Sequence, residues 1–203
     1  MFSTTDCELK IEESFNRMLN LIKIREQNDS DAILTNIYKG GPSPEHWLKF
    51  ELFSQLSHGF RGTSWEVLVE KRYHGPRIDI AISFEGDLVV VLELKLIANW
   101  SFTDSQQKGI LKDIKKLNAI DNPNLIKYIL VFTQFAKPKH EQVDWMRKQI
   151  SGKTGVSEEP EFTVRVKNLL QAHPKEKIRT LQYLETTNRF FDKLTLGGVL
   201  IKV

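Results

Sequence analysis

The sequence predicts one α/β domain built from a mixed β-sheet with helices on its faces. Apolar residues recur every three or four positions in several segments, which is the spacing of an amphipathic helix. Other segments are shorter and carry alternating or continuous apolar residues, as strands do. The segments follow the order helix, three strands, helix, strand, helix, and this order suits a sheet flanked by helices.

The N-terminal part of the chain is expected to be helical. Residues 6–25 have the apolar spacing of an amphipathic helix, and residues 29–38 predict a short second helix after a polar break. A longer helix is expected at 43–57, because Ser43 is a good capping residue and Pro44 suits the first helical position. The apolar residues that define the two long helices are Ile11, Phe15, Met18, Leu19 and Ile22 in one, and Trp47, Leu48, Leu52 and Leu56 in the other.

Three strands are predicted next, at 65–73, 77–84 and 88–97. The first two alternate apolar and other residues, whereas the third is almost continuously aliphatic, which is typical of a strand buried on both faces. The short segment 85–87 between the last two strands predicts a hairpin loop, in which Gly86 can adopt a positive φ angle.

The rest of the chain is expected to complete the sheet. A strand that follows a crossover helix returns in the same direction, so the strand after the next helix can pair in parallel with 88–97. The predicted elements are a helix at 104–119, a buried strand at 126–132, a helix at 139–150, a polar loop at 151–160, a strand at 161–166, a helix at 181–194 and a terminal strand at 198–203. The single domain, 1–203, thus divides into an N-terminal helical extension at 1–40, a core at 43–135 and a C-terminal helix and strand addition at 136–203.

Composition narrows the classes of protein. Hydrophobic residues make up 40% and charged residues 27%, which excludes the composition of a disordered chain. The net charge of +3 does not by itself require a nucleic-acid partner. No stretch is long and apolar enough for a membrane span, and the N-terminus lacks the pattern of a signal peptide. The one cysteine, Cys7, allows no internal disulfide and has no nearby His, so we expect a cytoplasmic protein without a catalytic thiol.

The predicted hairpin brings two carboxylates together. If its loop is centred on Gly86, then Asp79 and Glu93 lie equally far before and after the loop and face each other across the two strands. Lys95 lies two residues beyond Glu93 and therefore shares its face of the sheet, with Arg77 opposite. A shift of one residue in the register would separate these side chains.

Opposed carboxylates within an apolar strand need a physical reason. Like charges repel across a sheet, and a buried charge costs several kcal/mol unless it is paired or bound to a metal. A divalent cation removes the conflict, and Mg²⁺ is commonly held by one or two carboxylates together with water and phosphate. We therefore expect a Mg²⁺ site, at which Mn²⁺ could substitute, with Lys95 positioning or deprotonating a water for phosphodiester hydrolysis. The alternative is a structural cluster of ion pairs at the end of the sheet.

The motifs Arg77-Ile78-Asp79 and Glu93-Leu94-Lys95 resemble those of the PD-(D/E)xK nuclease superfamily. The resemblance covers the core at 43–135, and it implies the restriction-endonuclease-like fold, in which a helix, a three-strand meander, a helix and a further strand follow one another. Ile78 stands where the motif name has Pro, at a position that varies in the family.

The resemblance also implies the roles of residues. Asp79 and Glu93 would bind Mg²⁺, Lys95 would activate the water, and Glu51 on the first core helix would support the metal. The implied products carry a 5′-phosphate and a 3′-hydroxyl. Family members include restriction enzymes, resolvases and repair nucleases, many of which cut as dimers, so the implied partners are DNA and a second copy of the chain.

Several basic or polar residues are candidates for DNA contact, each with a plainer alternative as a solvated surface residue. The candidates near the motifs are Lys71, Arg72, Arg77, Gln107 and Lys108. Weaker candidates are His74 as a general base, Trp100 and Phe102 for stacking on bases, and the basic stripe of Lys112, Lys115 and Lys116, while Asp104 is expected to cap a helix. Two functions stay open: a metal-dependent DNA endonuclease, for which restriction enzymes are one model, and a non-catalytic nucleic-acid-binding or assembly module on the same fold.

Overall fold

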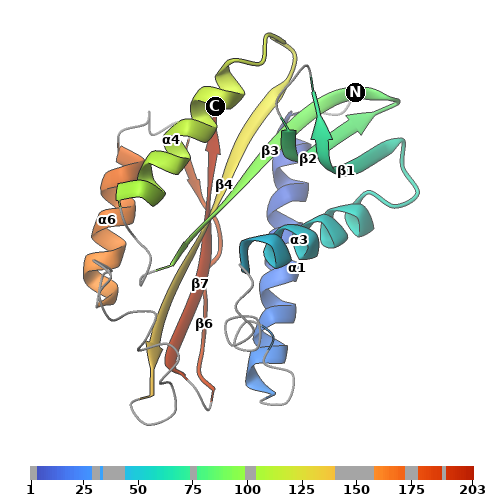
Figure 1. Cartoon of the computed structure of the whole chain (residues 1–203). Helices are drawn as coiled ribbons and strands as arrows, with labels where there is room; N and C mark the ends of the chain where they lie inside the picture. Colours follow the sequence, from blue (N-terminus) through green and yellow to red (C-terminus); the bar gives the residue numbers. More distant parts are fainter. Residues whose placement is uncertain are drawn as a thin grey trace.

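The structure is a computed structural model that describes residues 4–28, 33, 44–73, 77–98, 104–139, 158–171, 178–188 and 191–203. It is an α/β fold, in which helices lie on both faces of one mixed seven-stranded sheet (Figure 1). The predicted class, an α/β fold with a mixed sheet, is therefore confirmed. The described helices are α1 (Thr4–Gln27), α3 (Pro44–Gly59), α4 (Asp104–Asn118) and α6 (Glu159–Gln171). None of them is long and apolar enough to cross a membrane.

The sheet has the order β1-β2-β3-β4-β7-β5, and β6 also pairs with β7. Strands β1, β2 and β3 form an antiparallel meander, β4 joins β3 in parallel after α4, and β7 runs antiparallel to β4. The strands are β1 (Trp65–Arg72), β2 (Arg77–Phe84), β3 (Asp87–Ala98), β4 (Ile126–Pro138), β5 (Ile178–Thr180), β6 (Leu184–Thr186) and β7 (Phe191–Lys202). The predicted meander and the parallel crossover strand are both present.

The β2–β3 hairpin has a two-residue turn, at Glu85 and Gly86, where both residues have positive φ angles of 52° and 90°. Two positive φ angles are typical of a type I′ turn, whose twist matches that of the flanking strands. A turn centred between these residues would set the register one residue away from the prediction. A bulge at Val89 restores it, because Ile82 pairs with Val90 and Ile80 pairs with Leu92.

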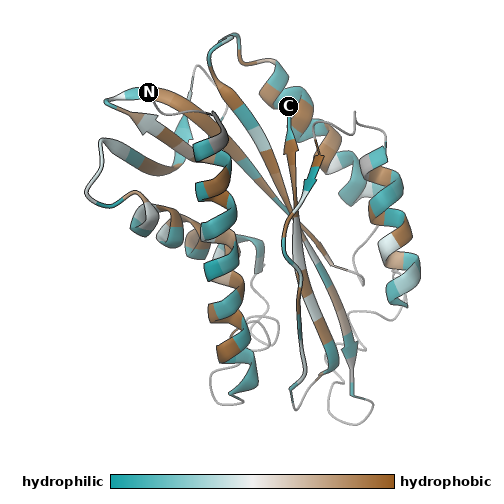
Figure 2. Cartoon of the chain, turned by 180° about the vertical axis from the view of Figure 1, so that it is seen from behind, coloured by the Kyte–Doolittle hydropathy of each residue, from teal (hydrophilic) through white to brown (hydrophobic). Residues whose placement is uncertain are grey.

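Two apolar cores form on opposite faces of the sheet (Figure 2). The larger core joins α1 and α3 to the sheet, and all five predicted apolar residues of α1 are buried in it. The smaller core lies under α4 and α6, with Ile110, Leu117, Phe162 and Val166 packed on β4 and β7. The helical spacing of apolar residues therefore identified correctly the face of α1 that meets the sheet.

The C-terminal predictions need correction. Residues 161–166, predicted as a strand, belong to α6, because Phe162 and Val166 at spacing i, i+4 are buried while Val164 between them is 54% exposed. Residues 181–194, predicted as a helix, contribute β6 and the start of β7. The terminal strand is longer than 198–203. The predicted helix at 29–38, apart from Ile33, and all of the helix at 139–150 except Lys139 lie outside the described residues.

Candidate functional site

Strands β2 and β3 separate at Asp79. Their cross-strand pairing ends at Ile80 and Leu92, and beyond that pair the amide N–H of Leu94 donates to Oδ2 of Asp79 at 2.9 Å. The alternation of β2 also changes here, because Ile80 packs in the larger core and Ile78 in the smaller one. The carboxylate of Asp79 therefore lies at the fork of two strands, beside the strand that carries Glu93.

Glu93 is a buried carboxylate, with 4% of the residue exposed. Its Oε1 accepts a hydrogen bond from Nζ of Lys116 on α4 at 2.7 Å. Burial raises the pKa of Glu93 to about 7, an effect that Lys116 opposes and that the nearby negative charges of Asp79 and Asp113 reinforce. The strand thus holds a carboxylate whose charge is costly, in a place where a bound cation would stabilise it.

Lys95 lies between two helices. Its Nζ is 3.9 Å from Oε1 of Glu45 on α3. On the other side it packs against α4, where a Cβ added to Gly109 would lie 3.1 Å from Cε of Lys95. Asp113, one turn further along α4, feels the positive charge of Lys95, while its own burial raises its pKa. The lysine is therefore held by contacts on both sides at the end of the fork.

A second lysine reaches the fork from α3. Lys49 is 5% exposed, and its Nζ lies 2.6 Å from Oε1 of Glu70 and 3.4 Å from Oδ1 of Asp79. Glu70 also accepts a hydrogen bond from Arg77 and has a positive φ angle of 53°, an uncommon conformation for a residue with a side chain. Local strain of this kind often occurs at functional sites.

These side chains form the charged cluster, in which acidic and basic groups from five elements lie close together. Its members are Glu45 and Lys49 of α3, Glu70 of β1, Asp79 of β2, Glu93 and Lys95 of β3, and Asp113 and Lys116 of α4. Three of them, Asp79, Glu93 and Lys95, are the residues that the sequence singled out, and the structure brings them to one place.

Glu51 is not brought to the cluster. Its Oε1 accepts a hydrogen bond from Gln55 one turn along α3, and no contact among the described residues joins it to Asp79, Glu93 or Lys95. Glu45 is the acidic residue of α3 that lies at the site, where its Oε2 also accepts the amide N–H of Leu96 at 3.0 Å. These glutamates are six positions apart in the sequence, so they point about 120° apart around the helix.

Sequence reasoning missed five members of the cluster as participants. Glu45 and Lys49 are spaced i, i+4 on α3, next to its buried leucines, and Asp113 and Lys116 are spaced i, i+3 on α4. Residues at these spacings share one face of a helix. Charged pairs at the edge of the apolar face of a helix could therefore have indicated that these residues lie near the sheet. Glu70 gave no such indication, since it is an ordinary residue of an alternating strand.

The candidates for DNA contact are dispersed. Lys71 and Arg72 are exposed at the end of β1, where Arg72 pairs with Arg77. On α4, Lys108 is exposed and Gln107 is half-buried in a groove that Arg165 of α6 also lines. Lys112 and Lys115 are exposed, Asp104 lies in the first turn of α4, and His74, Trp100 and Phe102 lie outside the described residues. Cys7 is buried, and burial raises its pKa to about 12, which fits an inert thiol.

The fit of a metal can be judged from the donor groups. Among the described residues, no three His, Cys, Asp or Glu side chains form a group able to hold a metal ion. Two carboxylates are nevertheless enough for Mg²⁺, which keeps several water ligands. The ammonium groups of Lys49 and Lys116 contact these two carboxylates and partly balance their charge.

Comparison with known proteins identifies no relative of the chain. No family model matches it, and neither a curated protein nor a solved structure matches it. The interpretation of the cluster therefore depends on its geometry and chemistry.

Proposed function

We propose that the chain is a Mg²⁺-dependent DNA endonuclease of the PD-(D/E)xK type, with its active centre at Asp79, Glu93 and Lys95. One observation carries the proposal: the strand fork holds Asp79 beside the buried Glu93, with Lys95 two residues further along the same strand. A buried carboxylate beside a second carboxylate favours a bound cation. The order of α3, β1 to β3, α4 and β4 also agrees with the core that the sequence motifs imply.

The proposed roles follow from the positions of the residues. Asp79 and Glu93 would hold the metal, and Glu45 takes the supporting role that the sequence assigned to Glu51, because Glu45 contacts Lys95 and the backbone of β3. Bound Mg²⁺ would polarise the phosphate and lower the pKa of an attacking water. Lys95, held between α3 and α4, would orient that water or neutralise the phosphate charge.

The product ends expected from this chemistry are a 5′-phosphate and a 3′-hydroxyl. The exposed residues at the ends of β1 and β2, Lys71, Arg72 and Arg77, are the proposed phosphate contacts. A homodimer would supply two such centres, one for each strand of a duplex.

A second candidate is a non-catalytic nucleic-acid-binding or assembly module on the same fold. The observation that favours it is the pairing of both carboxylates with lysines: Lys49 with Asp79, and Lys116 with Glu93. In that case the charged cluster is structural, and metal neither binds nor stabilises the protein.

The test is plasmid cleavage by purified protein in Mg²⁺ and in EDTA, with Lys95→Ala beside the wild type. The control variant is Arg25→Ala, which removes an exposed basic side chain of α1 outside the cluster. We expect cutting that requires Mg²⁺, persists in the control and falls by about 10²- to 10⁴-fold in Lys95→Ala. Equal cutting by Lys95→Ala would place the activity elsewhere. DNA binding without cleavage in Mg²⁺ or Mn²⁺, on duplex, branched and single-stranded substrates, would support the second candidate.

A further inference from the structure

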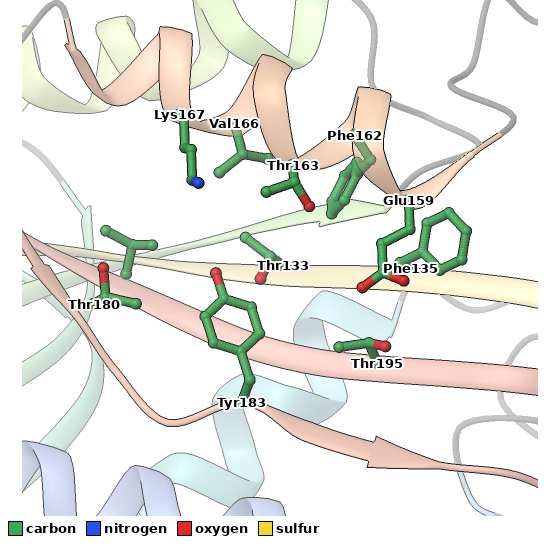
Figure 3. Close-up of a pocket in the computed structure, with 11 residues that line it drawn as sticks. Thr133, Phe135, Glu159, Phe162, Thr163, Val166, Lys167, Thr180, Tyr183 and Thr195 are labelled. Carbon is green, nitrogen blue, oxygen red and sulfur yellow. The ribbon is translucent and has the colours of Figure 1, made fainter.

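A cavity of about 220 Å³ lies between α6 and the C-terminal half of the sheet (Figure 3). None of its lining residues belongs to the charged cluster. Its volume is several times the ~30 Å³ share of one water molecule and below the ~300 Å³ at which pockets for drug-sized ligands begin. The cavity is therefore suited to a small molecule. We refer to it as the α6 cavity.

The floor of the α6 cavity has an unusual construction at Gly197 on β7. A Cβ added there would lie 2.2 Å from the ring of Tyr183, so the ring occupies the space where any other residue would place its side chain. Gly197 pairs with Thr133 of β4. The glycine thus lets the aromatic ring of Tyr183 lie across β7 beside Thr133, while Figure 3 shows its hydroxyl directed toward α6.

Apolar groups and hydroxyls share the lining. Phe135 and Phe162 have ring centroids 6.3 Å apart and lie at the end of the cavity near Glu159. The hydroxyl oxygens of Thr133 and Thr195 are covered, and neither has a hydrogen-bond partner among the described residues. A covered hydroxyl without a hydrogen-bond partner costs folding free energy. Rotation about the Cα–Cβ bond would let either hydroxyl form a hydrogen bond with a ligand.

A charged residue lies at each end of the α6 cavity, and only one of the two forms an ion pair with a described residue. Glu159 is paired with Lys193, which also pairs with Glu185 at 3.0 Å. Lys167 lies two turns further along α6, about 12 Å away. It is exposed, forms no ion pair with a described carboxylate, and directs its ammonium group toward the sheet and Tyr183 (Figure 3). The lining therefore has one unpaired charge, and that charge is positive.

We propose that the α6 cavity binds a small organic carboxylate with a compact apolar body. The apolar body lies against Phe135 and Phe162, and the carboxylate receives Lys167 and the hydroxyl of Tyr183. One lysine and a largely apolar lining match a monoanion better than a phosphate, whose two charges need more donors. This site is independent of the proposed nuclease activity.

The experiment measures binding of three matched probes by calorimetry and ligand-observed NMR: 3-phenylpropionate, its neutral amide and 3-phenylpropylamine. We expect a Kd of about 1 mM or tighter for the carboxylate, and at least about tenfold weaker binding of the other two. Lys167→Met, which keeps the length of the side chain, should remove the preference for the carboxylate. Lys115→Met, an exposed lysine of α4, should leave it unchanged.

Two further variants test the cavity and the hydroxyl of Tyr183. Val166→Trp should fill the space under α6 and abolish binding, and Tyr183→Phe should weaken binding of the carboxylate without affecting the fold, because Tyr183 is 49% exposed. Binding of no probe, equal binding of acid and amide, or unchanged binding in Lys167→Met would each overturn the proposal. If only Val166→Trp misfolds, which circular dichroism reveals, the Lys167 and Tyr183 variants still decide it.

Discussion

The face of the sheet under α4 and α6 carries polar side chains in two places, and they are held in different ways. At β3, Glu93 and Lys95 each lie close to opposite charges from neighbouring helices, and the groups restrain one another. At β4 and β7, the hydroxyl oxygens of Thr133 and Thr195 are covered and have no hydrogen-bond partner among the described residues. In the first arrangement, the carboxylate of Glu93 could bind a cation and the ammonium group of Lys95 could bind a phosphate. The second leaves neutral groups beside a cavity. The comparison indicates chemistry at one place and binding at the other, and substitutions can test whether the two are separate.

The largest expected effect is that of Asp79→Asn on cleavage. Loss of a metal-binding carboxylate should cost several kcal/mol of transition-state stabilisation, equivalent to about 10³-fold in rate. The asparagine oxygen can still accept the N–H of Leu94, so the melting temperature in EDTA should change little. Plasmid cleavage and thermal melts of the same preparation measure both. A large loss of stability with no loss of cleavage would identify the cluster as structural.

The matched substitution in the other region is Val166→Trp, which fills the α6 cavity. Cleavage by a folded Val166→Trp protein should remain within about threefold of the wild type, since no residue that lines the cavity belongs to the charged cluster and distant sites usually act independently. A loss as large as that of Asp79→Asn would show that the two regions act together.

Two adjacent glycines of β7, Gly197 and Gly198, face opposite sides of the sheet, and their substitutions should differ in their effect on stability. A Cβ at Gly198 would lie 2.5 Å from the ring of Phe15, which is fully buried between α1 and the sheet. Gly198→Ala should therefore cost about 1–3 kcal/mol of unfolding free energy, as overpacking does. Gly197→Ala should cost less, although its contact is closer, because Tyr183 is half exposed and can move outward. Urea unfolding of the two variants gives the order, and the reverse order would contradict this account of the cavity floor.

The two glutamates of α3 can be distinguished in the same way. Glu45→Gln should reduce Mg²⁺-dependent cleavage by about 10- to 100-fold, the range found when a group that orients a metal site is lost. Glu51→Gln should leave cleavage nearly unchanged, because Glu51 pairs with Gln55. Cleavage rates at saturating Mg²⁺ decide between them. The opposite result would restore the role that the sequence motif assigned to Glu51.

The structure places Glu45 rather than Glu51 at the charged cluster, and this difference illustrates which features the sequence could predict. Segments with strong periodicity, such as α1 and the β2–β3 hairpin, were predicted with their buried faces, because local spacing decides them. The register that places Ile80 opposite Leu92 agrees with the predicted hairpin centre, but it arises from a tight turn together with a bulge at Val89, which no local pattern indicated, and the pairing ends before Asp79 and Glu93. The C-terminal elements were predicted poorly, since β6 forms by pairing with β7, and β7 forms by pairing with β4, which is distant in the sequence. Residues 161–166 satisfy both periods, and only packing on the sheet selects the helix.

The smallest expected effect concerns the pH dependence of stability. Glu93 has a pKa of about 7 in the folded protein against an ordinary value of 4.5, because burial and the charges of Asp79 and Asp113 outweigh the stabilising Lys116. The folded state therefore binds the proton more tightly than the unfolded chain does. Its contribution to stability falls as the pH rises from about 4.5 to about 7, and is constant above that.

Glu93→Gln removes this dependence, so in EDTA the melting temperature of the variant should gain on that of the wild type as the pH rises from 5 to about 7, and by no more above it. Mg²⁺ should act in the opposite direction. A metal binds the ionised carboxylate, so the stabilisation of the wild type by Mg²⁺ should increase over the same pH range and be absent in Glu93→Gln. Calorimetric melts with Mg²⁺ and with EDTA measure both effects. If the pH dependence appears but Mg²⁺ does not stabilise the wild type, Glu93 is a buried acid satisfied by Lys116, and the non-catalytic alternative gains.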